Sequence, residues 1–152
     1  MGTRAHMATV DVSESSNLTP AAAWALASDL RRFDEWLTIF GGWRGPVPDT
    51  IEVGTTVSSL IKVKGFRNVI HWEVTRYEEP RRIALHGHGR GGVQIQLDMT
   101  VTDGQPGSTF HLVAELRGGL LSGPVGRLVA KVVESDVRRS VRKLARLSPT
   151  AS

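Results

Sequence analysis

The sequence contains no cysteine, a single tyrosine and few aromatic residues, which make up 6% of the chain. Without cysteine, disulfide bonds and thiolate metal sites are excluded, and the redox compartment is left open. No apolar run approaches the ~20 residues that a membrane-spanning helix needs, and no signal-peptide pattern opens the chain. We therefore expect a cytoplasmic protein without a membrane span.

The composition is that of one ordinary globular domain, because 40% of the 152 residues are hydrophobic and 22% are charged. A chain of this length can bury a substantial core. Residues 1–6 resemble a cloning remnant ahead of a natural Met7, and Ser148-Pro149 ends the last periodic segment. We expect a single domain over residues 7–148 and a short tail over residues 149–152.

A long amphipathic helix is predicted over residues 124–147. Apolar residues recur there at spacings of three and four, which is the period of one helix face. This stripe consists of Leu121, Val125, Leu128, Val129, Val132, Val133, Val137, Val141, Leu144 and Leu147. Ser122 can cap the start, and Pro124 lies where a first-turn proline is tolerated. Since the helix would be about 36 Å long, only the strand-rich middle of the chain offers enough apolar area to cover it.

The opposite face of this helix carries most of the positive charge. Between Arg117 and Arg146 there are eight Lys or Arg and two acidic residues, whereas the chain as a whole has a net charge of +4. A basic helical face can bind nucleic acid, anionic lipid or an acidic protein, but a solvated face is the simpler explanation. Nucleic acid is therefore not expected as a partner.

The rest of the chain is predicted to form one strand, two short helices and a run of strands. Alternating apolar and polar residues predict strands over 9–15, 55–63, 66–77, 82–86, 93–102 and 110–116. Short helices are predicted over residues 20–26, capped by Thr19, and over residues 29–38. Gly41-Gly42 should break the chain after the second helix, and residues 87–92 should form a loop. Because the strands are consecutive and joined by short turns, the sheet should be antiparallel.

This order of elements resembles that of the START-related superfamily called SRPBCC, which includes the birch-pollen-allergen fold, bacterial polyketide cyclases and lipid-transfer proteins. Within it, the sequence is most similar to small actinobacterial proteins known as toxin components of type II toxin-antitoxin pairs. The motifs that carry the resemblance are Ala27-Ser28-Asp29-Leu30, Glu35-Trp36-Leu37-Thr38, Val63-Lys64-Gly65, Arg76-Tyr77, Gly91-Gly92-Val93 and Leu120-Leu121-Ser122-Gly123-Pro124. They are specific for a fold and much less specific for a function.

The resemblance implies an α+β helix-grip fold, in which a curved seven-stranded antiparallel sheet wraps around a long C-terminal helix, with two short helices after the first strand. It also implies a cavity between sheet and helix, for which the aliphatic inward positions leave room. Periodicity selects its walls as Ile61, Ile70, Trp72, Leu85, Ile95, Leu97 and Leu112 from the sheet, and Leu121, Leu128, Val129 and Val132 from the helix. Trp36, Phe40 and Trp43 should lie at the entrance, or alternatively pack the end of the core.

Motifs for catalysis are scarce in this sequence. There is no nucleophile elbow with partner residues, and residues 87–92 are not a dinucleotide fingerprint because a strand follows them. His86 and His88 would share one face of a strand, but no acidic neighbour completes a metal site, so neither a metal nor a cofactor is expected. In cyclases of the superfamily a few polar cavity groups assist the reaction, and His86, Arg90 and Arg117 are the only candidates here. The sequence favours a binding protein over an enzyme.

Three functions therefore remain open. The first is binding of a small hydrophobic molecule, such as a lipid or a polyketide, in the cavity. The second is a growth-inhibiting toxin regulated by a small antitoxin protein, and the third is a polyketide cyclase or dehydrase. Neighbouring genes would discriminate them, since a short acidic or DNA-binding reading frame favours the toxin and polyketide synthase genes favour the enzyme.

Overall fold

The computed structural model describes residues 7–63, 66–104, 106–119 and 126–147 of the chain. Its strands are β1 (Met7–Ser16), β2 (Phe40–Trp43), β3 (Thr56–Val63), β4 (Phe66–Glu78), β5 (Arg82–His88), β6 (Gln94–Asp103) and β7 (Ser108–Arg117). Its helices are α1 (Pro20–Ala27) and α2 (Gly126–Leu144), and η2 (Leu30–Glu35) and η3 (Arg90–Gly92) are short 3-10 segments. None of the helices in these ranges is both long and apolar enough to span a membrane.

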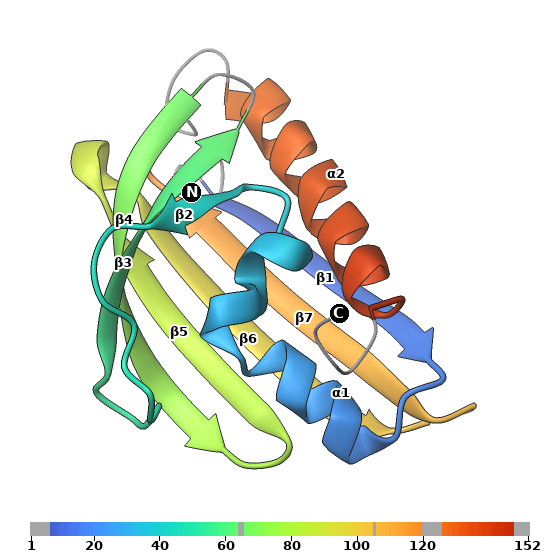
Figure 1. The fold of residues 1–152 in the computed structure, drawn as a ribbon. Coiled ribbons are helices and arrows are strands. Elements are labelled where there is room, and N and C mark those ends of the chain that lie inside the picture. Colours follow the sequence, from blue (N-terminus) through green and yellow to red (C-terminus); the bar gives the residue numbers. More distant parts are fainter. Residues whose placement is uncertain (1–6, 64–65, 105, 120–125, 148–152) are drawn as a thin grey trace.

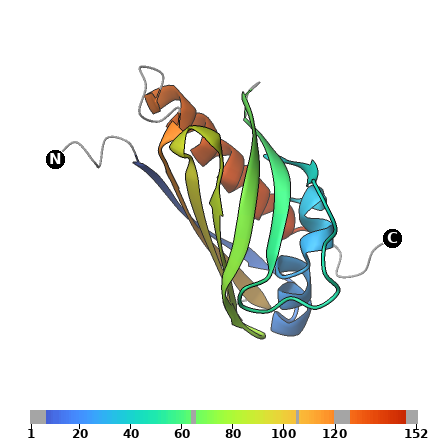
Figure 2. The same cartoon turned by 90° about the vertical axis from the view of Figure 1, so that its left-hand side faces the viewer.

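The strands form one antiparallel sheet in the order β1-β7-β6-β5-β4-β3-β2. The sheet curls around α2, which packs on β1 at one edge and also contacts β3, one strand from the other edge. Figures 1 and 2 show this curvature, with α1, η2 and α2 all on the concave side. The predicted helix-grip fold is confirmed, including the antiparallel arrangement of its seven strands.

Alternation along the strands decides which face of the sheet is buried. In β4, Ile70, Trp72 and Val74 are buried, whereas Val69 and His71, at the alternate positions, are exposed. Side chains alternate between the two faces of a strand, so one apolar face of β4 packs into the core and the other contacts water. The strand predictions made from alternation are confirmed to within two or three residues at the ends.

The prediction that Gly41-Gly42 breaks the chain was wrong, because these residues lie inside the edge strand β2. Phe40 pairs with Ile61 and Trp43 pairs with Ser59, with an irregularity between them. A Cβ on Gly41 would lie 3.0 Å from Leu60 side-chain carbons, so a larger residue would require the Leu60 side chain to shift. Alternation cannot reveal a strand of four residues in which two have no side chain.

The second predicted helix is also shorter than expected, since the 3-10 segment η2 replaces an α-helix over residues 29–38. Asp29 caps its start by accepting a hydrogen bond from the Arg31 amide, 3.0 Å away. Arg32 donates two hydrogen bonds, of 2.8 and 2.7 Å, to the carboxylate of Glu35. This interaction lowers the pKa of Glu35 and ties the segment together within little more than one turn.

The apolar stripe of α2 faces the sheet, and its described members divide into buried and exposed positions. The buried residues of the helix are Gly126, Val129, Val133, Val137, Ser140, Val141 and Leu144. Leu128 is instead 65% exposed and Val132 is only half-buried. Leu128 precedes the buried Val129 by one position, and Val132 likewise precedes the buried Val133. Each therefore lies about 100° around the helix from its buried neighbour.

The buried Ser140 connects α2 to the chain between η2 and β2. Its hydroxyl accepts a hydrogen bond from the Thr38 amide at 2.9 Å and donates one to the Asp136 carbonyl at 2.7 Å. The Thr38 hydroxyl also lies 3.1 Å from the Ser140 hydroxyl. A polar side chain within the apolar stripe is therefore satisfied, and it holds the helix at a defined position.

Aromatic side chains fill one part of the core, between η2, β2 and the sheet. The ring centroid of Phe33 lies 5.2 Å from that of Trp36 and 5.9 Å from that of Trp43. Phe40 and Trp43 stack edge to face at 4.9 Å. Valine, isoleucine and alanine side chains predominate where Val129 and Val133 of α2 face the sheet. Because branched aliphatic side chains are shorter than these rings, the two parts of the core are filled to different extents.

Candidate functional site

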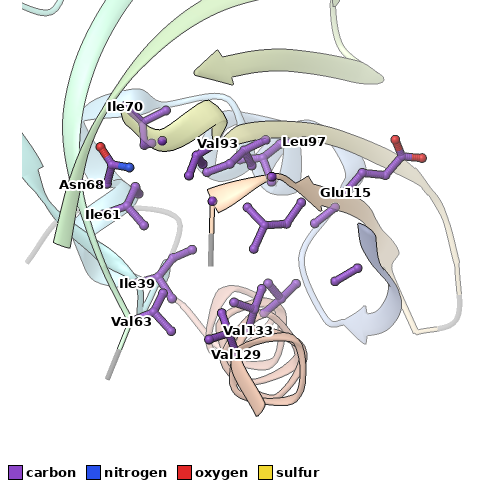
Figure 3. A pocket seen from close by; sticks show the side chains of 18 of the residues that line it. Ile39, Ile61, Val63, Asn68, Ile70, Val93, Leu97, Glu115, Val129 and Val133 are labelled. Atoms are coloured by element: carbon purple, nitrogen blue, oxygen red, sulfur yellow. The ribbon is translucent and has the colours of Figure 1, made fainter. Parts of the chain in front are cut away.

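A cavity of about 500 Å³ lies between α2 and the concave face of the sheet, at the end where β3 meets β4. Figure 3 shows Val129 and Val133 projecting from α2 toward Leu97 of β6 and toward Val93, which directly precedes β6, with Ile39, Ile61 and Val63 closing one side. The apolar lining consists of Ala8, Val10, Ile39, Ile61, Val63, Ile70, Val93, Ile95, Leu97, Ala114, Leu116, Val129, Val133 and Val137.

The space exists because short side chains face one another across a wide, curved sheet. Ala8 and Ala114 come from β1 and β7 beneath the helix, and Val129 and Val133 from the helix above them. None of these side chains is long enough to fill the gap that a strongly curled sheet leaves over its middle strands. The cavity is thus a consequence of residue size at defined positions, and it is almost entirely aliphatic.

Polar residues gather at one end of this cavity. Arg67, Asn68 and Arg90 line it there, and both arginines are exposed, so the cavity reaches the solvent at this end. The side-chain Nδ2 of Asn68 donates a hydrogen bond to the main-chain carbonyl of Arg90 at 3.1 Å. The side-chain Oδ1 of Asn68 accepts one from the main-chain amide of Arg90 at 3.3 Å. These two bonds hold η3 against the start of β4 and so fix one side of the opening.

Glycine backbones form the other side of the opening. Gly91 and Gly118, which both line the cavity, have positive φ angles of 78° and 76°. A Cβ on Gly118 would collide with the Gly92 carbonyl oxygen, so any other residue would clash with the main chain. The segment after β7 can therefore pack directly on η3, which brings two distant parts of the chain together over this end of the cavity.

Several predicted wall residues line the cavity, namely Ile61, Ile70, Ile95, Leu97 and Val129. Phe40, Trp43, Trp72 and Leu85 instead surround a separate void of about 10 Å³, which Ile61 and Leu97 also touch. Trp72 donates a hydrogen bond from Nε1 to the buried hydroxyl of Ser59 at 2.9 Å. The aromatic cluster and Trp72 therefore do not line the cavity, and Phe40 and Trp43 do not stand at its opening, contrary to the expectation from the sequence.

Other predicted wall residues lie away from the cavity. Trp36 and Leu112 are buried in the packed core, where Trp36 packs against Phe33 and its Nε1 has no hydrogen-bond partner among the described residues. Leu128 points to solvent and Val132 lies beside the buried stripe, so neither lines the cavity. Leu128 and Val132 were included because the predicted apolar stripe covered a wider part of the helix surface than the buried face does. Trp36 and Leu112 were included because periodicity predicts which side of an element faces inward but not where along it a cavity lies. Leu121 lies outside the described residues.

Other lining residues were not predicted from the sequence, and two groups among them are informative. Val133 and Val137 belong to the predicted stripe and could have been selected from it. Ala8 and Val10 come from the edge strand β1, and Ile39 precedes β2, where no strand was expected. Their place in the wall depends on how the sheet curls, and only tertiary packing determines that.

His71, His86 and His88 lie on the opposite, convex face of the sheet. Pairing of β4 with β5 places His71 opposite His88, with ring centroids 5.6 Å apart, and Glu73 opposite His86. An acidic neighbour is thus present, contrary to expectation, although it is distant in sequence. Even so, within the described ranges no three His, Cys, Asp or Glu side chains are arranged to hold a metal ion.

A curved antiparallel sheet wraps around a long helix, and an aliphatic cavity lies between them. These features define the protein as a member of the helix-grip class. The sequence model of the family described as "Polyketide cyclase / dehydrase and lipid transport" matches residues 7–148. The chain belongs to this family, and the SRPBCC resemblance is confirmed.

Two relatives from Mycobacterium tuberculosis strain H37Rv match nearly the whole chain. "Toxin Rv0910" is 40% identical over 136 residues, which cover 90% of this chain and 94% of the relative. "Uncharacterized protein Rv1546" is 35% identical over 141 residues, which cover 93% of this chain and 99% of the relative. Among solved structures, TTHA0849 from Thermus thermophilus has a TM-score of 0.69 at 15% identity, covering 90% of this chain and 94% of that one. Such low identity establishes the shared fold alone.

Proposed function

We propose that this protein binds a small apolar molecule in the cavity between α2 and the sheet. The observation that carries the proposal is an aliphatic cavity of about 500 Å³ that reaches solvent at one end. Pockets for small molecules typically measure about 300–1,000 Å³ and are lined mainly by apolar side chains with a few polar groups. Both the size and the lining of this cavity agree with that range.

Binding is favoured over catalysis by the residues available inside the cavity. The titratable residues that line it within the described ranges are Arg67, Arg90 and Glu115. Figure 3 shows the Glu115 carboxylate pointing away from the cavity. His86, a candidate for a cyclase reaction, lines a separate groove on the convex face. General acid-base catalysis needs a titratable group within hydrogen-bond reach of the substrate. Because His86 lies outside the cavity and the Glu115 carboxylate points away from it, a polyketide cyclase or dehydrase is only the third candidate function.

Purified protein should take up a hydrophobic fluorescent probe, and an aliphatic competitor should displace it. Because a ligand that binds only the folded state stabilises it by mass action, a competitor at 100 times its Kd should add about 2.7 kcal/mol to the free energy of unfolding. Probe fluorescence and thermal unfolding measure the two effects, and mass spectrometry of the extracted protein identifies any molecule that co-purifies.

The exposed Leu128 provides a control for this experiment, since a probe could also bind apolar surface. The variant Leu128→Ser should retain the full probe signal. Loss of that signal in Leu128→Ser, or no uptake by the unmodified protein, would contradict binding in the cavity.

A second candidate function is a toxin whose activity a small antitoxin protein suppresses. It is supported by the 40% identity to a relative named as a toxin and by unpaired positive charge on α2. Arg138 and Arg139 form ion pairs with Glu134 and Asp136 at 3.2 Å. Arg142 and Lys143 are exposed and form no ion pair with the described residues. An acidic partner could therefore bind at this end of the helix.

Reversing these two charges with Arg142→Glu and Lys143→Glu tests the second candidate. Each exposed substitution should change the free energy of unfolding by only about 0.5 kcal/mol, part of it from the lost interaction with the helix dipole. Probe uptake should be unchanged, whereas binding of an acidic protein encoded beside this gene should be lost. Pull-down and calorimetry provide the measurements, and Arg81→Glu, at an exposed turn, serves as the control. Partner binding that survives the reversal and is insensitive to salt would contradict an electrostatic partner.

A further inference from the structure

Two histidines face each other across neighbouring strands on the convex side of the sheet. His71 of β4 pairs with His88 of β5, and both side chains are exposed. Their ring centroids lie 5.6 Å apart, with an angle of 44° between the ring planes. Residues directly opposite each other in an antiparallel pair have Cβ atoms about 4.5–5.5 Å apart, so the backbone itself holds the two imidazoles close together.

The distance between the rings is close to what two imidazoles need in order to bind one metal ion. A bond of about 2.0–2.1 Å from each ring nitrogen puts the metal roughly 3.2 Å from each ring centroid, and at a tetrahedral angle the centroids are then about 5 Å apart. The observed distance of 5.6 Å is only slightly longer. Small rotations of two exposed side chains close this difference, and the strands need not move.

A hydrogen bond from the next strand orients one of the two rings. Ser58 of β3 lies opposite His71, and its hydroxyl is 2.8 Å from Nδ1 of that histidine. When Nδ1 carries the proton and donates it to this hydroxyl, the lone pair of Nε2 is free for a metal, which is how metal-binding histidines are usually supported. The ring of His88 forms no hydrogen bond with the described residues, so it is available as the second ligand.

The pair lies in a groove of about 410 Å³ on the convex face, which residues 44–46 after β2 also line. The groove contains one cationic and one anionic side chain, Arg44 and Glu73. Both are exposed and form no ion pair with the described residues. Because their formal charges cancel, the groove carries no net positive charge that would repel a cation.

A third histidine of the groove, His86, lies farther along the same strand. It is opposite Glu73 and two residues from His88, which is roughly 6.6 Å along a strand. Among the described residues no three His, Cys, Asp or Glu side chains surround one point, so the arrangement is that of a pair of ligands. The pair could not be recognised from spacing along one strand, because it exists only through the pairing of β4 with β5.

We propose that His71 and His88 bind one divalent late transition-metal ion, such as Ni²⁺, Cu²⁺ or Zn²⁺, through one ring nitrogen each, with water in the remaining positions. Imidazole is a preferred ligand of these ions, whereas Mg²⁺ and Ca²⁺ prefer oxygen. The site is separate from the cavity, since neither histidine lines it. Two protein ligands leave coordination positions open toward the groove, where an external donor group can bind the metal.

Isothermal titration calorimetry with NiCl₂ on chelator-treated protein tests this inference. One ion should bind at the site, and His71→Ala and His88→Ala should each weaken its binding at least about tenfold. Ser58→Ala should weaken it by a smaller factor, because the hydroxyl orients a ligand without contacting the metal. MgCl₂ should not compete. Since both histidines are exposed, metal-free thermal unfolding and uptake of the hydrophobic probe should stay the same in these variants.

The matched controls are His86→Ala, in the same groove, and His111→Ala, outside it. His111 Nε2 lies 2.7 Å from Asp11 Oδ1. Both variants should bind Ni²⁺ within about threefold of the unmodified protein, and paramagnetic Ni²⁺ should broaden the ring NMR signals of His71 and His88 more than those of His111. Absence of binding, or binding that survives His71→Ala or His88→Ala unchanged, would overturn the site. A loss in His86→Ala as large as that in His88→Ala would overturn its restriction to this pair.

Discussion

Replacing Val133 by Phe is expected to abolish uptake of an apolar ligand at little cost to stability. Val133 is buried on α2 and projects into the cavity (Figure 3). Because a phenyl ring at this position would occupy empty space, it gains apolar contacts instead of displacing neighbours, and the free energy of unfolding should change by less than about 1 kcal/mol. Chemical denaturation measures the stability, and probe fluorescence measures the uptake.

The matched control for this prediction is Val141→Phe, on the same face of the same helix. Val141 is fully buried and does not line the cavity, so the added ring has no space to enter. That substitution should cost about 1–3 kcal/mol and leave ligand uptake in the remaining folded protein unchanged. Equal destabilisation by the two variants would mean that the core around Val133 is already filled, which would contradict the cavity.

Replacing Trp72 by Ala is expected to have the largest effect on stability, with a loss of about 3–5 kcal/mol. Trp72 is only 5% exposed, and Gly87, opposite it in β5, leaves room for the indole, whose Cε3 would lie 2.7 Å from a Cβ on that glycine. The substitution also leaves the Ser59 hydroxyl buried without its hydrogen bond. Chemical denaturation compares the free energies of unfolding.

A smaller loss is expected for Trp72→Phe, since most of the ring contacts remain and only the hydrogen bond to Ser59 is removed. In Trp72→Ala the void beside the aromatic cluster should join the main cavity, because Ile61 and Leu97 line both. Saturating aliphatic ligand should therefore recover more stability in Trp72→Ala than in the unmodified protein. A cost below about 1 kcal/mol for Trp72→Ala would show that Trp72 is not a packed boundary of the cavity.

Much of the fold follows from local patterns in the sequence. Alternation along β4 and β6 identified strands and their buried faces, since the strand period needs no information from elsewhere in the chain. The spacing of Val129, Val133 and Val137 identified α2 in the same way. Thr19 was correctly predicted as a helix cap, because its hydroxyl accepts a hydrogen bond from the Ala22 amide three residues away. These interactions are local, so residue types at short spacing are enough to predict them.

The location of the cavity depends on tertiary structure. Periodicity predicts which side of a strand faces inward, but it does not say where along the strand large and small side chains meet. Pairing places Trp72 beside Gly87 and brings Ala114 next to Leu97. The curl of the sheet then sets Ala8, on one edge strand, and Val63, near the other edge, around the same helix. The sequence by itself determined most of the elements and most of their apolar faces, whereas strand pairing and sheet curvature decided which part of the core stays empty. A void depends on side chains distant in sequence that pack against one another.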